Sequence, residues 1–87
     1  MEIVKGCAVR SRAGRDKNRF FAVLELDDGF AYVADGNLRK LDKPKRKNLR
    51  HLAGTLHRFS EEELQSDKSL YGAICARFYT GTPSREG

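Results

Sequence analysis

The segment that decides the fold is FFAVLELDDGFAYVA, residues 20–34. Residues 20–27 are dense in aromatic and β-branched side chains, which favours a β-strand. Asp28 and Gly29 follow as the centre of a two-residue type I′ turn, which is the strongest short-range signal for a β-hairpin. The register set by this turn places four apolar side chains on the face that is expected to form the core: Leu24, Leu26, Ala31 and Val33.

The same register pairs Leu24 with Val33 and leaves Phe30 and Tyr32 on the opposite face of the hairpin. Two aromatic side chains on the less buried face need a cover. We expect the C-terminal helix to supply that cover, and a binding partner is the alternative.

A further strand and a basic loop are predicted before the hairpin. Residues 3–12, IVKGCAVRSR, contain an alternating stretch, as expected for a strand with one face toward the core. Residues 13–19 are polar, and Gly14 and Asn18 are the two best able to adopt a positive φ, so this segment is predicted to be a loop. In the strand, the side chains that share one face are Cys7, Val9 and Ser11.

The segment after the hairpin carries most of the charge. Residues 38–52, LRKLDKPKRKNLRHL, hold seven cations and one anion. Pro44 excludes both a helix interior and a central strand at that point. Because leucines stand at both ends of the segment, we predict a basic loop over residues 37–50 that is pinned at both ends. Residues 49–52 are predicted to be a short last strand that closes a barrel.

Two capping signals mark a C-terminal helix. Ser60 and Glu63 have the spacing of a capping box, in which each side chain accepts a hydrogen bond from the other residue's backbone N–H. Ser66 offers a second N-cap before a run of apolar residues at three- and four-residue steps. We therefore predict a helical region over residues 60–79, with its main helix near 67–79, packed on the strands of residues 1–59.

The charge is distributed unevenly along the 87 residues, a length that fits one small domain. The formal net charge is +5, but residues 1–59 hold 14 basic and 7 acidic side chains, whereas residues 60–87 hold 3 and 5. A basic body with a mildly acidic end indicates a polyanionic partner for the first part only. Residues 80–87 are predicted to be a flexible tail.

The sequence shows neither a membrane-spanning segment nor a secretion signal. The longest apolar run, residues 20–24, is far shorter than the ~20 residues that a membrane span needs. No basic stretch followed by an apolar one marks a signal peptide at the N-terminus. Cys7 and Cys75 are interpreted as two reduced thiols that act as small buried hydrophobes. We expect a cytoplasmic protein that makes no membrane contact.

Residues suited to catalysis or to metal binding are sparse. His51 and His57 are six positions apart with no Cys, Asp or Glu between them, and zinc sites need closer ligand pairs. No carboxylate pair sits among apolar residues, no Ser or Cys lies in a nucleophile-like turn, and there is no glycine-rich phosphate loop. We expect no enzymatic activity, no cofactor, no metal site and no small-molecule substrate.

Three features together match a known motif: the first strand, the loop GRDK at residues 14–17, and an apolar strand that starts at Phe20. This arrangement resembles a KOW motif, the RNA-contacting hairpin of several ribosomal and transcription-elongation proteins. The continuation from ADG at residues 34–36 to His51 and Leu52 is similar to small bacterial KOW-domain RNA-binding proteins. It resembles more distantly the archaeal and eukaryotic large-subunit ribosomal protein of the fourteen-e type. The resemblance covers residues 3–53.

The resemblance implies an α+β, mainly β fold: an SH3-like (KOW) five-stranded barrel, here followed by a C-terminal helix. It also implies contact with RNA, and ribosomal RNA is the expected kind. Ribosomal proteins would then be further partners. Two groups of cations are expected to converge on one rim of the barrel and bind phosphates, because Arg and Lys are the side chains that neutralise a nucleic-acid backbone. The predicted RNA-binding residues are Arg12, Arg15, Lys17, Arg19, Arg39, Lys40, Lys43, Lys45, Arg46, Lys47, Arg50 and His51.

Two other functions stay open at this point. SH3-like barrels also bind peptides, and Phe30 and Tyr32 would form an aromatic groove for a proline-rich segment if both were exposed. A role on DNA or RNA in transcription is the second.

Overall fold

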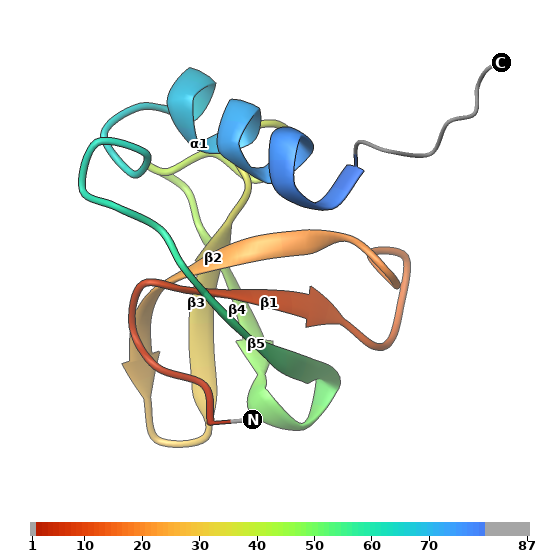
Figure 1. Cartoon of the computed structure of the whole chain (residues 1–87). Helices are drawn as coiled ribbons and strands as arrows, with labels where there is room; N and C mark the ends of the chain where they lie inside the picture. Colours follow the sequence, from red (N-terminus) through yellow and green to blue (C-terminus); the bar gives the residue numbers. More distant parts are fainter. Residues whose placement is uncertain (1, 80–87) are drawn as a thin grey trace, which may run out of the picture.

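A five-stranded antiparallel sheet and one C-terminal helix make up the computed structural model, which describes residues 2–79 (Figure 1). The fold is therefore small and α+β, as predicted; the expected tail at residues 80–87 lies outside the described residues. The elements are β1 (Cys7–Ser11), β2 (Phe20–Asp27), β3 (Phe30–Ala34), β4 (Lys45–Asn48), the 3₁₀ turn η1 (Leu49–His51), β5 (Leu52–Arg58), α1 (Asp67–Ile74) and the π-helical turn η2 (Cys75–Tyr79).

The sheet has the strand order β4-β3-β2-β1-β5 and is not closed into a barrel, so the predicted closure is wrong. Asn48 ends one edge strand and Leu52 begins the other, with only the three residues of η1 between them. Four residue steps reach at most about 14 Å, so the sheet must curl until its two edges approach at this turn. The edges meet there without forming a β4–β5 ladder among the described strands. The predicted last strand at residues 49–52 is instead this turn, and β5 starts where that prediction ended.

The central hairpin has the turn that its sequence predicts. Asp28 has φ 35° and Gly29 has φ 87°, and both central residues of a type I′ turn need positive φ. Directly beyond the turn, Asp27 pairs with Phe30 and Leu26 with Ala31, as expected.

The register changes farther along the hairpin, and the predicted pair of Leu24 with Val33 is wrong. Val23 pairs with Val33 because a β-bulge inserts Leu24 as an extra residue. The bulge turns Leu24 to the other face, where it packs under the helix, and puts Val23 into the core. Leu26 also leaves the predicted core, since it lies at the end of the sheet and is 38% exposed. Ala31 and Val33 are buried as predicted.

The concave face of the curled sheet encloses one hydrophobic cluster. Cys7 and Val9 lie in it, and Ser11 is buried on the same face, so the predicted alternation of β1 is confirmed. The buried members of this cluster are Cys7, Val9, Phe21, Val23, Ala31, Val33 and Leu52.

The convex face is built around a row of three alanines. Ala8 pairs with Ala22, and Ala22 pairs with Ala34, so the three lie side by side across β1, β2 and β3. All three are fully buried, and Leu70 and Ile74 of α1 pack against them. Three short side chains in register leave a flat seat, so the helix can approach the sheet closely.

The main helix begins at Asp67, as predicted, and its helical structure extends to the last described residue. Ser66 is its N-cap and forms a capping box with Ser69, and helical structure continues through Tyr79. Its last turn is tied to the sheet, because Phe78 stacks on Phe20 with ring centroids 4.1 Å apart. The Tyr79 hydroxyl accepts a hydrogen bond of 2.9 Å from the Phe20 backbone N–H.

The helix does not cover Phe30 and Tyr32, which corrects that prediction. The aromatic ring of the sheet that packs with the helix is Phe20, at the opposite end of the hairpin. Phe30 and Tyr32 are half-buried and stand outside that cluster.

Candidate nucleic-acid interface

The first basic loop, residues 12–19, is folded by its own backbone hydrogen bonds. Gly14 and Asn18 have φ of 78° and 71°, as the sequence predicts. The Asn18 N–H donates to the Ser11 carbonyl, and the Lys17 N–H donates to the Gly14 carbonyl. Arg15 and Lys17 are left exposed on this loop.

The second basic segment, residues 38–52, is part loop and part strand. Its residues Lys45–Asn48 form β4, where a loop was predicted. Pro44 is compatible with this because it stands just before an edge strand. Pairing with β3 alternates the cations: Lys47 lies opposite Ala31 on the concave face, and Arg46 lies opposite Tyr32 on the convex face.

Asp16 joins the two basic segments. Its carboxylate lies 3.5 Å from the Lys47 ammonium and 3.9 Å from the Arg39 guanidinium. The Lys47 ammonium also donates a 3.3 Å hydrogen bond to the Ser11 hydroxyl, and it lies 5.9 Å from the centroid of the Phe21 ring. The side chains of Lys47 and Asp16 are only 10% and 11% exposed. Lys47 is therefore held by the protein itself, and not left free on the surface.

Sequence reasoning missed Asp16. Its signal was visible, because it is the one acidic residue in a loop of four cations. A single carboxylate among cations that is also buried is expected to have a structural charge partner.

The two segments meet a second time beside the 3₁₀ turn. The Arg12 N–H donates a 2.8 Å hydrogen bond to the His51 carbonyl, and Ser11 pairs with Leu52 across β1 and β5. The Asn48 side chain caps η1 by accepting from the Arg50 N–H at 2.9 Å. Residues from both segments therefore surround the point where the edges of the sheet approach each other.

Most of the predicted RNA-binding residues face solvent. The exposed ones are Arg12, Arg15, Lys17, Lys40, Lys43, Arg46, Arg50 and His51. The others, Arg19, Arg39, Lys45 and Lys47, are half-buried.

Two predicted residues lie apart from the meeting point of the segments. Arg19 is near Tyr79: burial raises the pKa of Tyr79 above its ordinary value, and the Arg19 charge partly offsets this rise. Arg46 lies over Phe30, with the guanidinium carbon 3.8 Å from the ring centroid.

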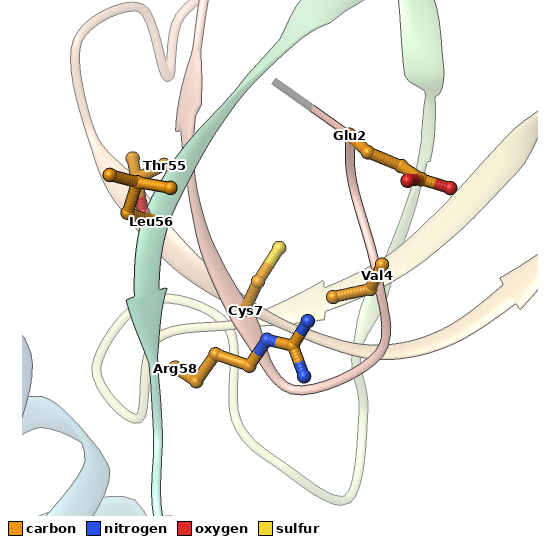
Figure 2. Close-up of a pocket in the computed structure, with 6 residues that line it drawn as sticks. All are labelled: Glu2, Val4, Cys7, Thr55, Leu56 and Arg58. Atoms are coloured by element: carbon orange, nitrogen blue, oxygen red, sulfur yellow. The ribbon is translucent and has the colours of Figure 1, made fainter.

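Two cavities open elsewhere on the surface. Figure 2 shows the first, of about 210 Å³, which is lined by residues of the N-terminal segment, by Cys7 of β1 and by residues of β5 that include Arg58. The second, of about 270 Å³, lies between β5 and the helix and is lined in part by His57 and Arg77. None of the twelve predicted RNA-binding residues lines either cavity. The predicted cationic surface therefore lies outside both of these cavities.

Within residues 2–79, no three His, Cys, Asp or Glu side chains are grouped so as to hold a metal ion. No helix in the same range is both long and apolar enough to cross a membrane. Comparison with protein-family models and with curated proteins found no match to this chain.

Proposed function

We propose that this protein binds RNA through its cationic rim, which we define as Arg12, Arg15, Lys17, Arg50 and His51. The observation that carries the proposal is the contact between the two basic segments. Asp16 bridges them through Lys47 and Arg39, and the Arg12 backbone N–H donates to the His51 carbonyl just beyond the last pair of the β1–β5 ladder. All five rim residues are exposed.

The electrostatics of the rim favour a polyanion. Asp16 is the one carboxylate in the first basic loop, and it is already occupied by two cations. The exposed rim cations therefore repel one another with no anion of the loop left to soften the repulsion. A phosphate chain would relieve this cost and release its own counterions, which stabilises the complex further.

Ribosomal RNA is the RNA that we propose, on the ground of the KOW-like loop and strand. A five-stranded antiparallel sheet that curls but stays open is compatible with an SH3-like fold, which we propose for the same reason. A cytoplasmic location, ribosomal proteins as further partners, and a binding role without enzymatic activity belong to the same proposal.

Peptide binding through an aromatic groove is less well supported. Arg46 occupies one side of the Phe30 ring, and Phe30 and Tyr32 are half-buried. A proline-rich peptide needs open aromatic faces, so it would first have to displace the guanidinium.

The test is a salt titration of RNA binding by fluorescence anisotropy. If about five phosphates are contacted, log K falls against log[salt] with a slope of about −3.5 for a single strand. Replacing Arg15 and Arg50 with Gln removes two contacts. The slope should then weaken by about 1.4, which corresponds to roughly 25-fold lower affinity at 0.1 M salt.

The matched control replaces Lys68 and Arg77, two exposed cations of the helical region, with Gln. It removes the same charge away from the rim and should leave the slope nearly unchanged. Tight binding with a slope near zero would falsify the electrostatic mechanism. Equal losses in the two double variants would show that net charge alone, and not the rim, attracts the RNA.

A further inference from the structure

We propose that the convex face of β3 and β4 binds unpaired RNA bases by stacking on Arg46. This inference rests on the proposed RNA binding and names the class of RNA: single strands or loops, in place of continuous duplex. The observation behind it is that Arg46 lies over the Phe30 ring, with 3.8 Å between the guanidinium carbon and the ring centroid.

The strand register explains why Arg46 and Phe30 are neighbours. Arg46 lies directly opposite Tyr32, and Phe30 lies opposite Asn48, so Phe30 is the diagonal neighbour of Arg46. Phe30 and Tyr32 are two residues apart on β3 and share the convex face. A guanidinium over an aromatic ring gains cation–π attraction, so Arg46 is held in place before any ligand arrives.

Arg46 is also available to a ligand. Arg46 is exposed, and no carboxylate of the described residues forms an ion pair with it. β4 is an edge strand, so among the described strands none pairs with it on the side away from β3. The guanidinium therefore has one face on Phe30 and its charge unneutralised.

This chemistry selects an unpaired base. A guanidinium plane stacks on bases that are free of their neighbours, whereas the bases of an A-form duplex are stacked on one another and its deep groove admits no side chain. Stacking on a π-face tolerates every base, so little sequence preference is expected. Lys in the same position would keep the charge but lose the planar surface.

The first experiment uses the unmodified protein and two strands of equal charge. One is a ten-nucleotide oligouridylate, and the other is the same backbone without its bases. The intact strand should bind about tenfold more tightly, as expected for one stacked base, with the same salt slope for both strands. Equal affinity for the two strands overturns the stacking proposal and leaves phosphate binding in place. If neither strand binds, the proposed function itself fails.

The second experiment compares Arg46→Lys with Arg77→Lys, the same substitution at an exposed arginine of the helical region. Arg46→Lys should weaken binding of the intact strand about tenfold and leave binding of the base-free strand unchanged. Arg77→Lys should keep binding of both strands within about twofold, because it retains the charge at a position outside the cationic rim. An Arg46→Lys protein that binds the intact strand as tightly as the unmodified one overturns the proposal. If thermal melting shows Arg46→Lys to be destabilised, the two-strand comparison decides alone.

Discussion

Replacing Asp16 with Asn tests whether the contact between the basic segments holds the fold together. The change removes the carboxylate that lies 3.5 Å from the Lys47 ammonium and 3.9 Å from the Arg39 guanidinium. Lys47 then keeps the Ser11 hydroxyl at 3.3 Å and the Phe21 ring at 5.9 Å, but no carboxylate, in a side chain that is 10% exposed. A buried charge without its partner is strongly unfavourable, because the protein interior solvates it poorly.

The magnitude should lie at the low end of the range for broken buried pairs, since the 10% exposure of the Lys47 side chain lets some water reach the ammonium. We expect a loss of about 3 kcal/mol in the free energy of unfolding. For a domain of this size, that corresponds to a fall in Tm of about 12–24 °C. Urea denaturation followed by circular dichroism measures the first quantity, and thermal melting measures the second.

The control is the ion pair of Lys5 with Glu25. Its 3.2 Å distance is shorter than either contact of Asp16, but its side chains are 68% and 61% exposed. Water screens such a pair, so Glu25→Gln should cost no more than about 0.5 kcal/mol. The prediction thus ranks the longer contact above the shorter one, on the basis of burial.

A double-mutant cycle isolates the pair itself. In Asp16→Asn combined with Lys47→Met, neither charge remains to be buried, so the double variant should be more stable than Asp16→Asn alone. The coupling energy should be about 2 kcal/mol. If Asp16→Asn is as mild as Glu25→Gln, or if the cycle gives no coupling, then burial does not make this contact strong and the reasoning is refuted.

Three further outcomes follow from single contacts. Gly36→Ala should cost at least about 2 kcal/mol, since Gly36 has φ 79° and an added Cβ would collide with the Asp67 carbonyl. Gly72→Ala should instead stabilise the helix by about 1 kcal/mol, because an added Cβ there has no atom within 4 Å. Chemical denaturation measures the change in the free energy of unfolding for both variants. If both substitutions change it in the same direction, the predicted difference between the two glycines is contradicted. Burial raises the pKa of Tyr79. Its stabilising contribution is therefore present below about pH 10 and lost as pH rises through the folded-state pKa. Tyr79→Phe should reduce the loss of stability at alkaline pH, as measured by thermal melts at increasing pH. Near neutral pH it should cost about 1 kcal/mol of stability, because the Phe20 N–H loses its hydrogen-bond acceptor. If stability falls with alkaline pH as steeply as in the unmodified protein, the buried environment of Tyr79 is contradicted.

The residues by themselves determined the local structure. The type I′ turn at Asp28 and Gly29, the positive φ of Gly14 and Asn18, and the helix cap at Ser66 all matched their predictions. Each depends on interactions within about four residues, so the relevant partners stand next to one another in the chain.

The tertiary structure decided everything that depends on distant partners. The bulge at Leu24 changed which side chains reach the core, and no residue beside Leu24 marks it. The three alanines look unremarkable one by one, and they become the seat of the helix only when the strand register aligns them. Propensity acts within a strand, whereas registers and layers are set by packing between strands.

The candidate site shows the same division. Composition alone indicated a cationic surface, and most of the predicted residues are exposed. Only the fold separated their surroundings: Lys47 turns inward to Asp16, while Arg46, its neighbour in β4, turns outward over Phe30. Successive residues of a strand point to opposite faces, so adjacent cations of the same charge enter different environments, and the burial of each sets what it can bind.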